Sequence, residues 1–166
     1  MFENTHFRIS GTFVRICAVG QAESVLERHS PDRPEARYNR RGQDALYLTA
    51  TEESARVAMK KYVKHIKSPL VLATYEIEAC QLVDLRHPDL RLYKDCVGGD
   101  WQDALSKGIE PPSWNVSDLM RENHEIGLID PSRKDPTVWH VTLFRWNEAG
   151  APSVRVVGDP VPIVLT

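Results

Sequence analysis

The sequence RYNRRGQDALYLT, residues 37–49, joins a polar loop to a short apolar strand. Its three arginines, at positions 37, 40 and 41, carry planar and permanently charged groups that suit phosphate or carboxylate ligands. Loops held between rigid elements often display binding groups. The alternative is a basic loop that is simply solvated. The segments on both sides of the loop are needed to distinguish a ligand-binding loop from a solvated one.

Hydrophobic patterns on both sides of this segment predict short strands and helices. The predicted strands cover residues 12–19, 45–49, 70–77, 80–85, 126–129 and 138–146, with one or two more in residues 153–157 and 161–165. The predicted helices cover residues 51–67 and 116–123, and residues 21–29 and 101–107 are further helix candidates. Strands outnumber helices and do not alternate regularly with them. This order predicts a single compact α+β domain over residues 1–166, with about six or seven short strands and flanking helices. Its core is expected at about residues 10–147, followed by C-terminal strands in residues 151–166.

The helix predicted after the strand of residues 45–49 begins with a recognisable cap. Thr51 is suited to the N-cap position, and Glu52 and Glu53 follow in the first turn, where the helix dipole favours acids. Helical spacing predicts an inward stripe that begins at Ala55 and Ala58. At the other end of the chain, Ser117 or Asn115 is the predicted cap of the helix at residues 116–123.

Composition limits the classes of protein that the chain can belong to. It has 166 residues, 42% of them hydrophobic and 27% charged, so a folded core is expected. A net charge of −2 argues against direct nucleic-acid binding. The three cysteines, at positions 17, 80 and 96, form no metal-ligand pattern, which predicts no metal site and a reduced, cytoplasmic setting. No signal peptide and no membrane-spanning apolar run is expected.

Few single residues indicate chemistry on their own. Arg15 lies within an apolar strand, where it either faces solvent or projects into a cleft. The six histidines are scattered. His140 is the most notable because it lies in a core-type strand, yet it has no partner nearby in the sequence. Ser132 lies in a loop after a buried strand. The standard phosphate-loop, dinucleotide, zinc-protease and hydrolase motifs are absent.

Taken in order, these features resemble the RES domain family, named for arginine, glutamate and serine residues. The matching segments are the arginine-bearing strand at residues 13–16, the loop and tyrosine strand at residues 36–48, with tyrosine where the family has tryptophan, and residues 127–133 followed by the apolar strand at residues 141–144. The resemblance covers about residues 10–147.

One departure from the family pattern concerns the helix after the tyrosine strand. The family places a glutamate about eleven residues beyond the tyrosine, and counting from Tyr47 leads to Ala58. The acids that could replace it are Glu52, Glu53, Glu76 and Glu78, and the sequence does not choose among them. Glu52 and Glu53 lie roughly 240° and 140° away from position 58 around a helix.

The resemblance implies a fold related to ADP-ribosyltransferases and a site for NAD as the substrate, with no metal. RES proteins are usually toxins, paired with an antitoxin that has a helix-turn-helix DNA-binding domain, and they hydrolyse or phosphorolyse NAD or transfer ADP-ribose to a protein. Carried onto this sequence, the resemblance assigns Arg37 together with Arg15 to the phosphates, Tyr47 to the nicotinamide ribose and Ser132 to a polar contact in the cleft. Tyr38 and Asn39 would shape the loop. The alternative is a non-catalytic or attenuated module that binds a nucleotide or a protein, because Ala58 replaces the acid.

Overall fold

The computed structural model describes residues 1–165, apart from the side chains of Lys61, Val63 and Lys64, so Thr166 of the predicted domain lies outside the described residues. The strands are β1 (His6–Ala18), β2 (Leu46–Thr49), β3 (Leu70–Asp84), β4 (Gly127–Pro131), β5 (Trp139–Leu143), β6 (Val154–Val156) and β7 (Val161–Ile163). The helices are α1 (Glu52–Met59), α2 (Arg91–Val97), α3 (Trp101–Ser106) and α4 (Pro112–Glu122), with 3-10 turns η1 (Ser24–Leu26), η2 (Lys60–His65) and η3 (Pro88–Leu90).

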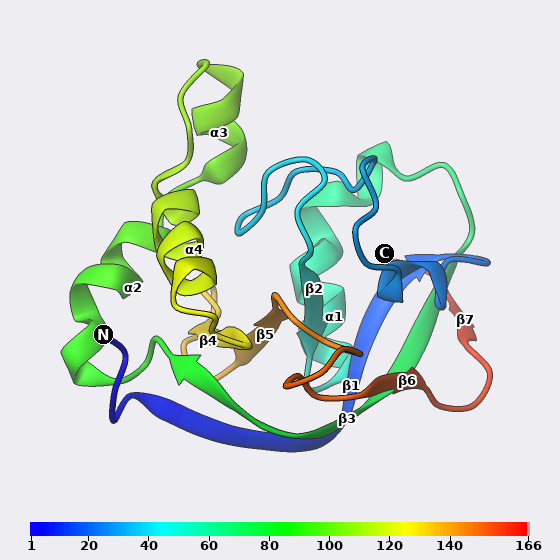
Figure 1. The fold of residues 1–166 in the computed structure, drawn as a ribbon. Helices are drawn as coiled ribbons and strands as arrows, with labels where there is room; N and C mark the ends of the chain where they lie inside the picture. The colour runs from blue at the N-terminus through cyan, green and yellow to red at the C-terminus, as the bar shows by residue number, and fades with distance from the viewer. Residues whose placement is uncertain (166) are drawn as a thin grey trace.

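Five of the strands pair in a closed circuit. β1 pairs with β2, β2 with β5, β5 with β4, β4 with β3, and β3 returns to β1 along most of its length. β1 and β3 are long and curved, and they sweep under the shorter strands (Figure 1). β6 and β7 add to the free edge of β3. Only the β3–β4 pair is parallel.

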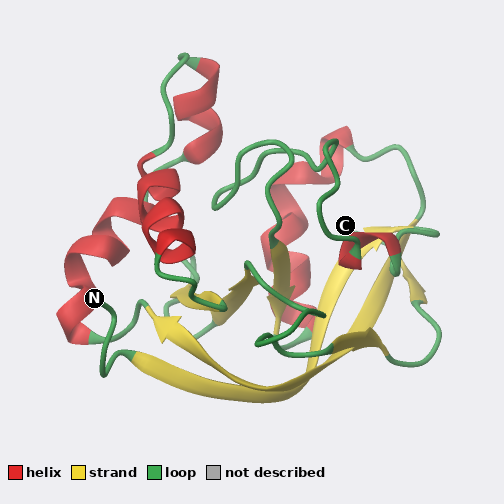
Figure 2. Ribbon diagram, in the orientation of Figure 1, coloured by secondary structure: helices red, strands yellow, loops and turns green. Residues whose placement is uncertain are grey.

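The two faces of β2, β4 and β5 bury different cores. One face points into the circuit, where Leu48, Val141 and Ile129 lie side by side in adjacent strands. The other face carries Thr142 and Leu128, and it packs against α2 and α4. The alternation predicted for residues 138–146 is therefore confirmed within β5, although the strand ends at Leu143 rather than at Trp146. Figure 2 shows α2, α3 and α4 gathered at one end of the sheet, while α1 lies apart from them against β1 and β2.

The predicted helix at residues 21–29 is wrong, because only the short turn η1 forms there. A helix needs its own backbone carbonyls as acceptors, and here side chains from elsewhere occupy them. Tyr75 donates to the carbonyl of Ala22 at 2.8 Å and Trp146 donates to that of Leu26 at 2.9 Å. These tertiary hydrogen bonds favour an irregular path over helical propensity.

The helix predicted at residues 51–67 is regular only to Met59 and continues as the 3-10 turn η2. Thr51 is its N-cap, as predicted, and accepts from the Ser54 amide at 3.1 Å. The predicted inward stripe is wrong at Ala58, which is exposed, because the helix rests on the sheet through its first turn, where Ser54 and Ala55 are buried.

Further boundaries differ from prediction, and β1 begins at His6 rather than at Thr12. The two strands expected at residues 70–77 and 80–85 form the single strand β3, since β1 accompanies it throughout and absorbs the irregularity as a bulge near Gly11. α4 starts at Pro112 rather than near Val116, because proline is compatible with the first helical position. Ser117 therefore lies inside the helix, buried, and does not cap it. α2 was not predicted.

Candidate functional site

A pocket of about 360 Å³ lies between α1 and the adjoining ends of β4 and β5. Its lining residues are Ala50, Thr51, Glu53, Ser54, Val57, Ser132, Asp135, Thr137, Val138, Trp139 and His140. The pocket brings together two residues singled out from the sequence, Ser132 and His140. It also contains Glu53, one of the four acids considered for the missing glutamate.

Strand register places the polar residues of the sheet beside the pocket. Thr49, His140 and Asp130 lie opposite one another across β2, β5 and β4. Ser132 follows Asp130 by two residues, and its amide donates to the carbonyl of Val138 at 2.7 Å. Residues two apart on a strand share a face. The sequence could have revealed Asp130 through this period, because it lies between the buried strand and the serine.

Ser132 is buried and sits in a turn that fixes its hydroxyl. Its Oγ accepts from the backbone amides of Lys134 and Asp135 at 3.3 and 3.4 Å. The hydroxyl hydrogen is not required by those contacts, so it can be donated to a ligand.

His140 lies in β5, the strand that pairs with β4. Burial and the charge of Arg37 lower the pKa of His140 below its usual range. His140 is therefore neutral at physiological pH and can accept or donate one proton.

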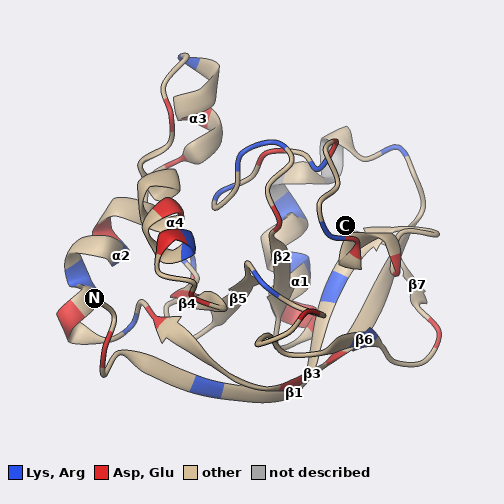
Figure 3. Ribbon diagram, in the orientation of Figure 1, with Lys and Arg blue, Asp and Glu red and all other residues tan. Residues whose placement is uncertain are grey.

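The three arginines of the loop that precedes β2 have three different environments, although Figure 3 shows this loop as a basic stretch of chain. Arg37 donates through Nη1 to the carbonyls of Val97 and Gly99, at 2.8 and 2.9 Å. Arg40 forms ion pairs with Asp118 and Glu110 and lies over the Trp114 ring. Arg41 is exposed. The loop is thus not a single anion-binding patch, and Arg37 alone among the three acts on the charge of His140 and Asp130.

Tyr38, Asn39 and Tyr47 form one buried unit beneath that loop. Tyr47 Oη donates to Asn39 Oδ1 at 2.6 Å and accepts from the Tyr38 amide at 3.0 Å. The rings of Tyr38 and Tyr47 stack with centroids 6.4 Å apart. Tyr38 Oη in turn donates to Asp130 Oδ2 at 2.9 Å. The unit therefore connects the loop to β2 and β4.

Asp130 is an unusual carboxyl group for a sheet interior. Its Oδ1 is buried and has no hydrogen-bond partner among the described residues. Burial raises its pKa to about 6, while the hydrogen bond from Tyr38 and the charge of Arg37 act in the opposite direction. An unpaired buried oxygen of this kind disfavours the ionised form.

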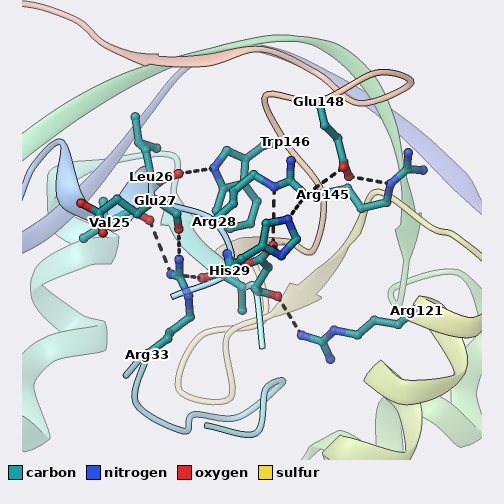
Figure 4. Close-up of polar contacts among 12 residues, drawn as sticks. Val25, Leu26, Glu27, Arg28, His29, Arg33, Arg121, Arg145, Trp146 and Glu148 are labelled. Atoms are coloured by element: carbon teal, nitrogen blue, oxygen red, sulfur yellow. Dashed lines mark hydrogen bonds and ion pairs between the residues drawn. The ribbon is translucent and has the colours of Figure 1, made fainter. Parts of the chain in front are cut away.

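Helix α4 holds the same loop from above through side-chain donors. Ser113 donates to the carbonyl of Arg37, Trp114 to that of Ala36, and Arg121 to those of Tyr38 and Asp44. Figure 4 shows contacts near η1, on the opposite side of the loop from α4. Arg33 donates hydrogen bonds to the carbonyls of Val25 and Glu27, and Arg28 forms an ion pair with Glu148. The loop is therefore fixed by arginines that bind backbone carbonyls.

Arg15 is placed differently from both expectations for it. It neither faces solvent nor lines the pocket, but is half-buried between β1 and β2, where Nη1 donates to the carbonyl of Tyr47 at 3.2 Å. Burial lowers its pKa, and its Nε has no partner among the described residues. Arg15 thus supports β2 from behind the pocket.

The described part of the chain contains no group of three or more His, Cys, Asp or Glu side chains placed to hold a metal ion. Within the same residues, no helix combines the length and the apolar character needed to cross a membrane.

A family model described as RES domain matches residues 12–166. No curated protein matches the sequence. Among solved structures, a chain of the M. tuberculosis MbcT–MbcA toxin–antitoxin complex is similar, with a TM-score of 0.66 and 16% identity over 95% of this chain and 86% of that chain. At this identity the likeness shows a shared fold, and it confirms the predicted α+β fold class.

Proposed function

We propose that this chain, which belongs to the RES domain family, is the toxin of a toxin–antitoxin pair and acts on NAD in the cytoplasm. The observation that carries the proposal is the pocket in which Ser132 and His140 meet α1, with the charge of Arg37 acting on His140. Family membership supplies the substrate class, and the pocket supplies polar groups at the place where a sugar can be held.

The proposed chemistry is cleavage of the bond between nicotinamide and ribose. As in glycoside cleavage, the ribose gains oxocarbenium character in the transition state. The acceptor is water, phosphate or a protein side chain, which correspond to hydrolysis, phosphorolysis and ADP-ribosyl transfer. Fixed dipoles that face the developing charge supply most of the stabilisation in such sites.

The residues take the following proposed roles. Arg37 binds the pyrophosphate through the Nε and Nη2 edge, since its two hydrogen bonds to carbonyls both use Nη1. Ser132 donates to a ribose hydroxyl, and His140 faces the sugar as a neutral imidazole. Tyr38 and Asn39 set the shape of the loop. Contacts of Tyr47 with the nicotinamide ribose and of Arg15 with the phosphates stay predictions, and neither these two residues nor Arg37 lines the pocket.

Purified protein incubated with NAD tests the proposal, with and without phosphate and with a cell extract as a source of protein acceptors. We expect release of nicotinamide, and the co-product identifies the acceptor. If no nicotinamide is released under any of these conditions and no protein is labelled, the proposed activity is wrong.

A non-catalytic nucleotide-binding module is the second candidate, because Ala58 occupies the position where the family has its glutamate. Calorimetry would then show NAD binding without turnover. Creation of turnover by Ala58→Glu, in a protein that otherwise only binds NAD, would decide for this second function.

A partner antitoxin with a helix-turn-helix domain completes the proposal. The similar solved structure comes from a toxin–antitoxin complex. The proposed partner covers the pocket and so blocks NAD. Expression of this chain alone should arrest the growth of the host cells, and co-expression with the product of an adjacent gene should relieve that arrest. The purified complex of the two proteins should release no nicotinamide from NAD.

A further inference from the structure

The proposed reaction requires a carboxylate near the ribose, and the position that the family uses for it does not supply one. Ala58 is exposed and does not line the pocket. Four acids were left open by the sequence, and the structure places each of them. This inference rests on the proposed function.

Glu76 and Glu78 lie on the exposed face of β3, which is paired with β1 on one side and with β6 on the other. Glu76 pairs with Arg155 of β6 at 3.1 Å. Glu78 accepts from the Ser153 amide at 3.4 Å. Both are engaged with the C-terminal strands, and neither lines the pocket.

The two acids in the first turn of α1 face different ways. Glu52 approaches Arg56 at 3.7 Å along the helix and is not part of the pocket. Glu53 lines the pocket together with Val57, four residues later on the same helix face. No ion pair or side-chain hydrogen bond engages the Glu53 carboxylate within the described residues.

Two other carboxylates lie close to this site, and each is already occupied. Asp135 lines the pocket, but its Oδ1 accepts from both the amide and the hydroxyl of Thr137, at 3.0 and 2.7 Å. Asp130 is bound by Tyr38 and its other oxygen is buried, so it cannot reach a ligand without a change in the loop. Glu53 is thus the pocket carboxylate with both oxygens available.

We propose that Glu53 is the catalytic carboxylate of this chain, relocated by five residues from the family position to the first turn of α1. In the reaction, the bond between ribose C1′ and the nicotinamide nitrogen breaks, and both electrons leave with neutral nicotinamide. The Glu53 carboxylate faces the positive charge that develops on the ribose. Ser132 and His140 hold the sugar from the opposite wall. The acceptor oxygen then bonds to C1′ and its proton is released to solvent.

The test compares Glu53→Gln with Glu52→Gln, its neighbour in the same helical turn. Both substitutions remove one negative charge near the helix N-terminus, and Glu52→Gln also removes the exposed pair with Arg56, so the control costs the helix at least as much as Glu53→Gln. We expect Glu53→Gln to lower kcat for nicotinamide release at least a hundredfold, while NAD affinity measured by calorimetry changes less than tenfold. Glu52→Gln should stay within threefold of wild type in both quantities.

The outcomes separate the two proposals. An active wild type whose Glu53→Gln variant is equally active overturns the role of Glu53 and leaves the proposed function standing. A wild type that releases no nicotinamide overturns both. Thermal unfolding of the two variants within a few degrees of each other excludes a difference in folding as the cause.

Discussion

Tyr47 Oη lies 2.6 Å from Asn39 Oδ1 and thereby fixes the conformation of the loop that carries Arg37. The same hydroxyl accepts from the Tyr38 amide, so one side chain of β2 satisfies two groups of the loop. This relationship ties the polar loop to β2, because the Tyr38 amide and the Asn39 side chain both find their partner in the Tyr47 hydroxyl.

Tyr47→Phe should loosen the loop without removing the ring stack. The substitution leaves the Tyr38 amide and the Asn39 oxygen without their partner, and an unsatisfied buried polar group costs about 1–3 kcal/mol. We expect a lower free energy of unfolding in urea and faster hydrogen exchange at the Tyr38 amide. Unchanged exchange at that amide would contradict the role given to the hydroxyl.

Asp130 should make stability fall as pH rises from about 4 to about 6. Its pKa is raised to about 6 in the folded chain, against 3.8 for an unperturbed carboxyl. The folded state therefore binds more protons than the unfolded state in this window, and stability decreases with increasing pH. The contribution is on the order of 2–3 kcal/mol. Asp130→Asn cannot titrate, so its unfolding free energy should lack this component.

The comparison of interest is the difference between wild type and Asp130→Asn in urea unfolding at pH 4, 5, 6 and 7. We expect the unfolding free energy of the variant to rise relative to that of the wild type as the pH increases across this series. A difference that does not change with pH would show that Asp130 is ionised normally.

Gly127→Ala should destabilise the fold. A Cβ on Gly127 would lie 2.1 Å from the carbonyl oxygen of Thr142, on the paired strand β5. That oxygen is backbone, so β4 and β5 would have to separate, at a cost of about 1–3 kcal/mol or more. Gly99→Ala is the control, because nothing lies within 4 Å of its Cβ position. The free energies of unfolding of the two variants should differ clearly, and equal values would contradict the close approach.

Arg37→Ala should reduce NAD turnover about a hundredfold to a thousandfold, because it would remove the proposed charged contact with the pyrophosphate. Arg41→Ala serves as the matched control, since Arg41 belongs to the same loop and is exposed. Arg37 also bonds the carbonyls of Val97 and Gly99, so the thermal midpoint of the variant must be measured alongside its activity. Equal loss of activity in both variants would indicate a general electrostatic effect rather than a specific site.

The sequence predicts those parts of the fold in which local pattern and tertiary packing agree. Alternation in residues 138–146 correctly assigns the faces of β5, and Thr51 correctly marks the start of α1. The helix expected at residues 21–29 fails because Tyr75 and Trp146, distant in sequence, bind its carbonyls. Such contacts leave no trace in local propensity.

The sequence likewise predicts some residues of the candidate site but not how they are grouped. Ser132 and His140 were noted separately, and strand register brings them to one pocket. The arginine cluster suggested one shared role, yet Arg40 is bound to Asp118 and Glu110. Neither acid lies near it in sequence, so charge counting alone could not have separated Arg40 from Arg37.

The closed circuit of strands has a consequence for the order of events during synthesis. β1 cannot complete its pairing until β3 has emerged from the ribosome, and the circuit stays open until β5 at residues 139–143 is available to join β2 and β4. Contacts between segments so distant in sequence form late. Ser132 follows β4 and His140 lies in β5, so this wall of the pocket is made by the strands that join the circuit last. A nascent chain therefore carries the arginine loop and α1 long before the pocket can form, because the residues of its second wall, Ser132 and His140, are synthesised much later.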